Sequence, residues 1–437
     1  MSPSNPKTPL PTRAQHRLER QLPKWSELRP LMQFSSLDLD RRRARLNKAA
    51  DLWDLRAIAQ RRTPKVAFDY VDGAANQEIS LDRTRQTFRD VEFTPGVLRD
   101  VSCVDLSTAI AGGTSALPFG IAPTGFTRMM HSGGEKAGVA AAHNKGIPFT
   151  LSTMGTSSIE EVAAAGPDGR RWFQLYLWKE REKSLALIER AAAAGYDTLL
   201  VTVDTAVAGA RLRDVRNGMT IPPSLTLKTV LDASYRPEWW FNFLTTEPLK
   251  FATLSGHTGS IADLVTTMFD PTLTFDDLAW LRQAWKGRLF VKGIQSVDDA
   301  RRVADCGVDG IVVSNHGGRQ LDRAPVPLRL VPDIRSAVGS DLEIILDSGI
   351  MNGGDIVAAL AAGADFTLIG RGYLYGLMAG GQEGVERAID ILRSEIQVVM
   401  QLLGVTAVSE LTSDYLCLDR EKPLLVSSLE HPTAFSR

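Results

Sequence analysis

The chain has 437 residues, 44% of them hydrophobic and 23% charged, which is ordinary for a globular protein with a large core. α/β barrels routinely use such a length as one domain. The formal net charge of −1 provides no basic field, which argues against nucleic acid as a partner. Cys103, Cys306 and Cys417 lie far apart without a CxxC pair. This spacing argues against a disulfide framework or a zinc site and favours a reducing cytosol.

Residues 1–50 are rich in Pro, Ser and Arg, and we expect a mostly irregular N-terminal extension. The basic residues near its start have no apolar run of about 7–15 residues behind them, so no signal peptide is predicted. No stretch approaches the roughly 18 apolar residues of a membrane-spanning helix. We therefore expect a cytoplasmic protein, and attachment to the inner face of the cytoplasmic membrane stays open.

From residue 117 onward, a short apolar run followed by an Ala-rich amphipathic segment repeats. Alternating apolar strands and helices predict parallel βα units, and eight units close into a (β/α)8 barrel. The barrel domain is predicted at 51–420, with a C-terminal tail at 421–437. The eight predicted strands are 118–125, 148–153, 172–177, 198–204, 289–294, 310–315, 343–349 and 366–371.

The connection between the fourth and fifth strands is far longer than the usual 2–6 residues or so plus a helix. It predicts an insertion in loop four at about 217–272, followed by a helix at 273–285. The insertion carries a cluster of large rings at 239–243 beside Arg236 and Lys250. Such rings and cations favour the headgroup region of a bilayer. The alternative, that the rings cap the barrel or pack between subunits, stays equally open.

Active sites of these barrels form at the C-terminal ends of the strands. Nearly every predicted strand ends in a hydrogen-bonding side chain, and eight polar ends converging on one mouth suit a flat ligand rich in heteroatoms. The candidates are Pro123, Thr124, Gly125, Ser152, Gln174, Tyr176, Thr202, Asp204, Lys292, Ser314, His316, Asp347, Gly370 and Arg371.

The loops after strands seven and eight commonly hold a phosphate through glycine N–H groups and a helix N-terminus. Gly353, Gly354, Gly370 and Arg371 have the required residue types. One glycine-rich loop is a weak signal, but two loops in the expected positions favour a phosphate site over plain turns.

His316 lies in the segment SNHGGRQLD at 314–322, with Arg319 three residues later. A neutral imidazole can accept a proton near pH 7, and a guanidinium can bind a carboxylate with two hydrogen bonds. Asp204 could orient the imidazole and stabilise its charged form. The alternative is a structural histidine. No HExxH motif, histidine pair or acidic cluster indicates a metal.

Lys292 ends the fifth strand and has three interpretations. A buried cation there could stabilise negative charge on a reduced flavin ring. It could instead form a Schiff base, as in a barrel aldolase, or belong to a structural ion pair.

Five segments resemble the FMN-dependent 2-hydroxy-acid oxidoreductases, a family that includes glycolate oxidase, mandelate dehydrogenase and L-lactate dehydrogenases. The resemblance runs from about residue 50 to 415, with the motifs in the family's order. The long loop four and the segments at 321–327 and 370–381 look most like quinone-linked bacterial L-lactate dehydrogenases. The five segments are AFDYVDGAA (67–75), IAPTGFTRMMHSGGE (121–135), WFQLYLWKE (172–180), TVDTAVAGARLRDVRNG (202–218) and SNHGGRQLD (314–322).

The resemblance implies a role for each matching residue. His316 would be the base and Asp204 its partner, while Tyr176 would hydrogen-bond the substrate. The substrate carboxylate would be held by Arg319, Tyr70 and Arg211. The flavin would be contacted by Thr124, Gly125, Ser152, Gln174, Thr202, Lys292 and Ser314, and its ribityl phosphate chain by Asp347, Gly349, Gly370 and Arg371.

Two residues depart from the family pattern. Met351 stands where many relatives have a phosphate-binding arginine, so FMN affinity would rest more on Arg371 and backbone N–H groups. Met154 stands where glycolate oxidases carry a tryptophan beside the substrate, so their substrate choice does not transfer.

The resemblance therefore predicts oxidation of L-lactate to pyruvate with FMN, a quinone or similar carrier as the acceptor, and a homotetramer. Three alternatives stay open. They are an FMN 2-hydroxy-acid oxidase that uses oxygen, a lysine aldolase or isomerase on the same barrel, and a non-catalytic flavin-binding scaffold.

Overall fold

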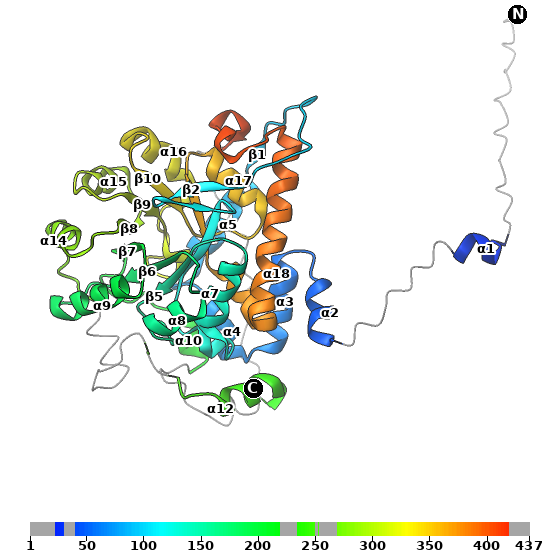
Figure 1. Ribbon diagram of the computed structural model, residues 1–437, viewed down its shortest axis with the longest axis horizontal. Coiled ribbons are helices and arrows are strands. Elements are labelled where there is room, and N and C mark those ends of the chain that lie inside the picture. The colour runs from blue at the N-terminus through cyan, green and yellow to red at the C-terminus, as the bar shows by residue number, and fades with distance from the viewer. Residues whose placement is uncertain (1–21, 30–39, 219–233, 250–251, 253–268, 419–437) are drawn as a thin grey trace, which may run out of the picture. The chain divides into compact units, whose positions relative to one another are not determined.

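The computed structural model describes residues 22–29, 40–218, 234–249, 252 and 269–418 (Figure 1). The chain divides into two units, Met1–Arg41 and Arg42–Arg437. In its described residues the first unit has one short helix, α1 (Trp25–Leu28). The second begins before the boundary predicted at residue 50, because α2 (Arg41–Asn47) carries Leu46, which is buried in the core.

The second unit is built around a closed barrel of eight parallel strands, and all eight predicted strands are present. Neighbours around the barrel follow the order β10-β11-β4-β5-β6-β7-β8-β9. The prediction of a (β/α)8 barrel is thereby confirmed. The strands are β4 (Phe119–Thr124), β5 (Phe149–Ser152), β6 (Arg171–Leu175), β7 (Thr198–Thr202), β8 (Arg288–Ile294), β9 (Gly310–Val313), β10 (Glu343–Leu346) and β11 (Phe366–Ile369).

Both faces of these strands are apolar because one face meets the helices and the other fills the barrel. In β7, Leu199 and Val201 belong to the core shared with the helices, whereas Leu200 belongs to the cluster inside the barrel. Trp172 from β6 stacks against Phe290 from β8 inside the barrel, with ring centroids 6.4 Å apart. The interior is therefore a packed core rather than a channel.

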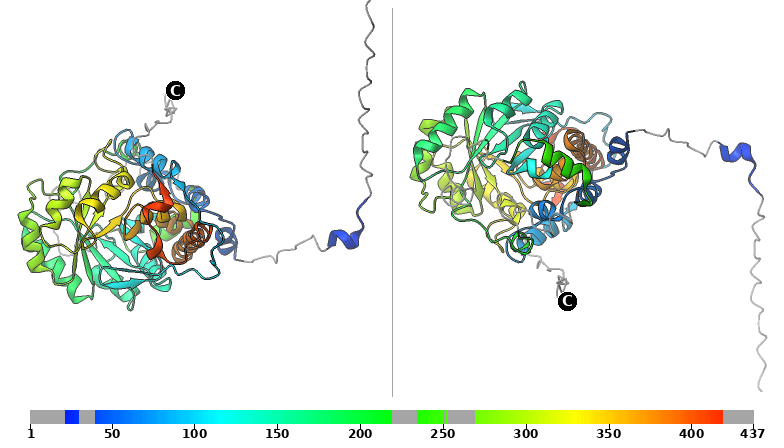
Figure 2. Two further views of the ribbon diagram at one scale, coloured as in Figure 1. Left: turned by 90° about the horizontal axis from the view of Figure 1, so that it is seen from above. Right: turned by 90° about the horizontal axis from the view of Figure 1, so that it is seen from below.

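Helices surround the strands, as both views of Figure 2 show. Those that follow the barrel strands are α7 (Gly134–Asn144), α8 (Ile159–Ala165), α9 (Arg181–Ala193), α14 (Asp276–Ala284), α15 (Val297–Ala304), α16 (Pro327–Val338), α17 (Gly353–Ala361) and α18 (Arg371–Leu403). In the part of the chain that the structure describes, no helix is long and apolar enough to cross a membrane.

Three further helices lie between α2 and the barrel: α3 (Leu52–Arg62), α4 (Lys65–Asp72) and α5 (Ile79–Arg89). α3 packs along α18, while α5 packs on the short 3-10 helix η3 (His316–Gly318) that follows β9. The N-terminal helices thus reach the end of the barrel where the strands finish. Two small elements complete this segment: the hairpin of β2 (Thr108–Ile110) and β3 (Gly113–Ser115), and the pairing of β1 (Glu92–Phe93) with β12 (Leu416–Cys417).

The described part of loop four contains α10 (Leu212–Arg216) and α12 (Pro237–Thr245). Both lie on the same side of the barrel as α4, opposite β1 and β2 (Figure 1). The predicted helix after the insertion corresponds to α14. Lys250, much of the predicted insertion and the predicted tail at 421–437 lie outside the described residues.

Candidate functional site

A cavity of about 490 Å³ opens at the C-terminal ends of the barrel strands. Its walls come from nearly all the strand ends and from α4, α5 and α10. Most of the predicted site residues line it: Tyr70, Pro123, Thr124, Gly125, Ser152, Tyr176, Arg211, Lys292, His316, Arg319, Asp347, Gly349, Gly370 and Arg371. Of the other four, Gln174, Thr202 and Ser314 lie one layer behind and hold wall residues in place, and Asp204 lies behind His316.

His316 and Asp204 form a hydrogen-bonded pair, as the sequence suggested. His316 Nδ1 lies 3.1 Å from Asp204 Oδ1 and 3.3 Å from Oδ2. Because Nδ1 is engaged, Nε2 is the ring nitrogen left for a ligand in the cavity. Burial raises the pKa of Asp204, but the charge of His316 and its hydrogen bond outweigh burial and lower that pKa overall. The carboxylate therefore stays ionised and can stabilise a protonated imidazole.

The backbone holds His316 in an uncommon conformation. Its φ of 57° is left-handed, and the next residue, Gly317, has φ 62°. The Asn315 side chain accepts a hydrogen bond from Gly318 N (3.0 Å), and Ser314 Oγ accepts one from His316 N (3.0 Å). Strain of this kind persists where surrounding contacts fix it, and it commonly marks functional sites.

Lys292 of β8 is buried between two partners that directly follow β9 and β10. Its Nζ donates to Ser314 Oγ (2.8 Å) and lies 2.8 Å from Asp347 Oδ2, and both charged side chains are less than a tenth exposed. Nucleophilic attack needs a neutral, unpaired amine. The ion pair therefore favours an electrostatic cation at the cavity wall over the Schiff-base interpretation.

A chain of buried polar side chains supports the wall on the other side. Ser152 Oγ donates to Gln174 Oε1 (3.1 Å), and Gln174 Nε2 donates to Thr202 Oγ1 (2.9 Å). These residues come from the adjacent strands β5, β6 and β7. Thr124, at the end of β4, hydrogen-bonds Tyr373 OH. The sequence placed all these groups at strand ends, and the barrel brings them to one mouth.

Two arginines and two aromatic hydroxyls face the cavity near His316. The guanidinium carbons of Arg319 and Arg211 lie 4.9 Å and 5.6 Å from the centroid of the Tyr70 ring. Burial, followed by repulsion from Arg211, lowers the pKa of Arg319 to about 9. Burial, followed by the charge of Asp204, raises the pKa of Tyr176 above its usual range, so this phenol keeps its proton. Two guanidinium cations in one cavity are suited to an anionic ligand.

The other end of the cavity is bounded by Gly349, Gly370 and Arg371. α18 begins at Arg371, and no side chain caps its N-terminus. The free N–H groups of such a first turn favour an anion. We call this end of the cavity the phosphate end, after the ligand that the sequence predicts for it.

The predicted contribution of Gly353 and Gly354 is wrong, since neither residue lines the cavity. Gly353 N donates to Glu395 Oε2 (2.7 Å), while Asn352 and Asp355 cap the start of α17 reciprocally. The Gly353 amide is thus satisfied within the chain, and the start of α17 does not face the cavity.

The sequence analysis missed two charged wall residues, Arg85 from α5 and Asp214 from α10. Asp214 lies in the family-like segment at 202–218. Burial raises its pKa and outweighs the lowering effect of the nearby Arg319 and Arg211 charges. Arg85 lies after the family-like segment at 67–75. Neither residue ends a barrel strand, so a search of strand ends does not find them.

The chain matches the sequence model of the FMN-dependent dehydrogenase family over residues 59–418. It is 58% identical over 395 residues to the "Putative L-lactate dehydrogenase" of Mycobacterium tuberculosis, covering 90% of this chain and 95% of that one. It is 42% identical to the L-lactate dehydrogenase of Ectopseudomonas mendocina, covering 84% and 98%.

Two solved structures have a similar fold. The crystal structure of the monotopic membrane protein (S)-mandelate dehydrogenase aligns with a TM-score of 0.82 at 37% identity, covering 85% of this chain and 100% of that one. Mandelate oxidase aligns with a TM-score of 0.74 at 36% identity, covering 85% and 98%.

Proposed function

We propose that this chain, which belongs to the FMN-dependent dehydrogenase family, oxidises L-lactate to pyruvate and passes the electrons to a quinone or similar carrier. The observation that carries the reaction is the His316–Asp204 pair facing the same cavity as Arg319 and Arg211. A base beside a carboxylate-binding site is what removal of a hydroxyl proton from a 2-hydroxy acid requires.

The cavity fits FMN, the cofactor of the family. It has an uncapped helix N-terminus for a phosphate, buried hydrogen-bonding side chains along one wall, and the Lys292–Asp347 pair. When bound, FMN supplies the acceptor for the two electrons that leave the substrate's α-carbon. The residues that would hold it are Pro123, Thr124, Gly125, Ser152, Gln174, Thr202, Lys292, Ser314, Asp347, Gly349, Gly370 and Arg371.

The roles of the substrate-facing residues follow from their positions. Arg319 and Arg211 would bind the substrate carboxylate beside the Tyr70 ring. Nε2 of His316 would take the hydroxyl proton, and Asp204 would stabilise the imidazolium. Tyr176 would donate a hydrogen bond to the substrate, since its phenol stays protonated.

We expect L-lactate to bleach the flavin anaerobically and D-lactate to leave it oxidised. Only one hand places the carboxylate at Arg319, the hydroxyl at His316 and the α-hydrogen at the flavin together. The measurement is the visible absorbance of the purified protein with each isomer, with glycolate and L-mandelate for comparison. Equal bleaching by both isomers, or by neither, would contradict the proposal.

The acceptor distinguishes the proposed dehydrogenase from an oxidase. Both a mandelate dehydrogenase and a mandelate oxidase share this fold, so the barrel itself favours neither acceptor. Reoxidation of the lactate-reduced protein by a soluble quinone analogue should be much faster than by dissolved oxygen. A homotetramer remains our expectation from the family resemblance.

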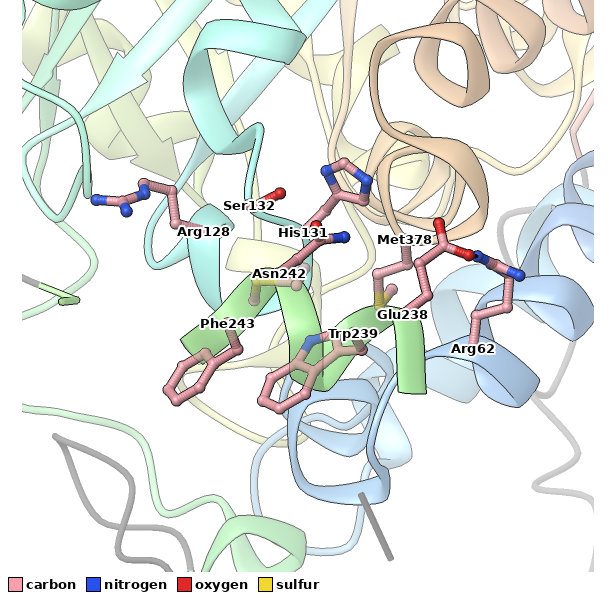
Figure 3. A pocket seen from close by; sticks show the side chains of 10 residues that line it. Arg62, Arg128, His131, Ser132, Glu238, Trp239, Asn242, Phe243 and Met378 are labelled. Carbon is pink, nitrogen blue, oxygen red and sulfur yellow. Dashed lines mark hydrogen bonds and ion pairs between the residues drawn. The ribbon is translucent and has the colours of Figure 1, made fainter. Parts of the chain in front are cut away.

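We further propose that α12 attaches the protein to the inner face of the cytoplasmic membrane, where quinone is available. Phe241 and Leu244 project from this helix with 68% and 67% of their surface exposed. In Figure 3 the helix covers a narrow pocket lined by Trp239, Phe243 and His131. The solved relative described as monotopic supports this proposal.

The ring cluster of the predicted insertion therefore has two faces. Trp239 and Phe243 stack with centroids 4.8 Å apart, and Trp239 Nε1 donates to Met129 O (3.0 Å). Glu238 pairs with Arg62 of α3. This face of the helix packs on the barrel unit, so the outward side chains are the ones available to lipid.

Replacing Phe241 and Leu244 with serine should release the protein from anionic vesicles and leave lactate turnover with a soluble dye near normal. Each substitution would remove about 2–3 kcal/mol of favourable apolar burial in the lipid, and these exposed side chains do not contribute to the packing of the barrel. The matched control is serine at Val398 and Leu402, which are exposed on α18. Vesicle sedimentation measures the binding, and unchanged sedimentation of the α12 variant would reject the anchor.

A further inference from the structure

The loop after β10, which bounds the phosphate end of the cavity, carries no cation. Its side chains at the cavity are Ser348, Ile350 and Met351, and Met351 is only 4% exposed. A thioether is a weak acceptor and has no charge to offer a phosphate. A dianion bound there needs its counter-charge from elsewhere.

Arg371 has only part of its hydrogen-bonding capacity left for a phosphate, because backbone carbonyls already accept hydrogen bonds from its guanidinium. Its Nε donates to Val71 O (3.0 Å), Nη1 to Gly317 O (2.8 Å) and Nη2 to Gly73 O (2.7 Å). These three bonds tie α4 and η3 to the start of α18. One N–H group on each nitrogen of Arg371 is therefore used to hold the cavity wall together.

Arg85 has the opposite character. It lines the same cavity from α5, and its Nε and Nη2 atoms are buried without a hydrogen-bond partner. Its guanidinium carbon lies 5.1 Å from the centroid of the Trp53 ring, which fixes its plane. Burial lowers the pKa of Arg371 and the charge of Arg85 lowers it further, so the two cations influence one another. Two buried guanidinium nitrogens without acceptors are costly, and an anion beside them would offset that cost.

The turn of α5 that carries Arg85 is fixed against the phosphate end. A Cβ built on Gly349, which has φ 87°, would come within 2.5 Å of Thr84 Cγ2. Thr84 Oγ1 accepts a hydrogen bond from Asn315 Nδ2 (3.0 Å), in the loop after β9. Arg85 is the next residue along the helix, so its place relative to both loops is set by close packing.

We propose that Arg85 is the cation that pairs with the terminal phosphate of FMN in this chain. The proposal rests on FMN being the cofactor and is independent of which hydroxy acid is oxidised. The guanidinium lies at the cavity wall, and its Nε and Nη2 have no hydrogen-bond partner, so its charge is available to a phosphate. A small shift of the side chain would bring this planar fork to two phosphate oxygens. Arg85 thus supplies the charge that the Met351 loop lacks.

The test compares two flavins that differ only in the phosphate. The full-length Arg85→Gln protein should bind FMN about 10- to 100-fold more weakly, the effect of losing a charge-assisted hydrogen bond. Its affinity for riboflavin should stay within about twofold of the unmodified protein's. Flavin fluorescence, which rises on dissociation after dilution of the holoenzyme and falls on rebinding, measures both constants.

Two further variants sharpen the result. Arg89→Gln, at the exposed end of the same helix, should leave both affinities unchanged. Arg85→Lys keeps the charge and the packing stem but loses the fork, so FMN binding should weaken by about 3- to 10-fold. Equal weakening of FMN and riboflavin in the Gln variant would assign Arg85 a purely structural role. An unchanged preference for FMN in the Lys and Gln variants would also overturn the proposal.

The Arg85 proposal and the proposed lactate oxidation can be contradicted separately. A protein that binds FMN through Arg85 but is not reduced by L-lactate would contradict the lactate proposal alone. A protein that oxidises L-lactate with equal preference for FMN and riboflavin would contradict the Arg85 proposal alone.

Discussion

The His316→Ala protein should keep its flavin, but L-lactate should reduce that flavin about 100- to 10,000-fold more slowly. This is the range that general acid–base catalysis contributes. The imidazole is held by Asp204 at Nδ1 and lines the cavity, so alanine removes the group that would accept the hydroxyl proton. The residues on β4 to β8 that would contact the flavin make no use of this side chain. Stopped-flow absorbance under anaerobic conditions measures the rate.

The matched control is His143→Ala, a half-buried histidine on α7 outside the cavity, which should reduce at the normal rate. Asp204→Asn should lie between the two, because the imidazole would keep its place but lose the charge that stabilises its protonated form. A near-normal rate of flavin reduction in the His316→Ala protein would contradict the assignment of His316 as the base.

The barrel could be predicted from the sequence because its strands are buried on both faces. Continuous apolar runs such as TLLVT at 198–202 have few other structural solutions when they alternate with helices. Once the barrel is assumed, the last residues of each run must meet at one end. That single geometric fact brings Lys292, Asp347 and His316 together before any coordinates are known.

The parts that could not be predicted depend on how separate segments dock. Arg85 reaches the cavity only because α5 packs on η3, a contact between residues far apart in the chain. Gly353 lies in a segment with the composition of a phosphate loop, but its amide donates a hydrogen bond to Glu395 on α18. Local patterns indicate which groups are available, whereas tertiary contacts decide which of them a ligand can use.

Loop four illustrates the same limit. The cluster at 239–243 indicates that large rings gather there, but composition alone gives no direction to them. The hydrogen bond from Trp239 Nε1 to Met129 O turns one side of α12 inward and leaves Phe241 outside. A serine scan chosen from the sequence would have replaced packing residues together with surface ones.

Arg319→Lys should raise the KM for L-lactate by about 10- to 150-fold, because an ammonium cannot reproduce two parallel hydrogen bonds to a carboxylate. Arg319 also donates from Nη1 to Tyr70 O (2.6 Å) and Gly73 O (3.1 Å), so lysine would loosen the wall beside the substrate. Arg323→Lys, at an exposed position nearby, is the control and should leave the KM unchanged. Steady-state assays with a soluble dye measure both, and an unchanged KM in the Arg319 variant would contradict its role.

Substrate affinity should also depend on pH through the same residue. The pKa of Arg319 is lowered to about 9, first by burial and then by the charge of Arg211. Below that pH the guanidinium is charged and binds a carboxylate, and as the pH rises through about 9 the charge and the affinity are lost together. A bound carboxylate favours the charged form, so the complex holds its proton to a higher pH than the free site. The dissociation constant of oxalate, read from the flavin absorbance, should therefore rise above about pH 9.

Arg211→Gln separates the two causes of this pH dependence. Removing the neighbouring positive charge should raise the pKa of Arg319 and move the loss of oxalate affinity to higher pH, even though the affinity at neutral pH falls with the second cation. Burial remains, so the shift should be partial and the pKa should stay below the ordinary arginine value of 12.5. A pH dependence that stays in place in this variant would mean that another group titrates, and it would withdraw Arg319 as its source.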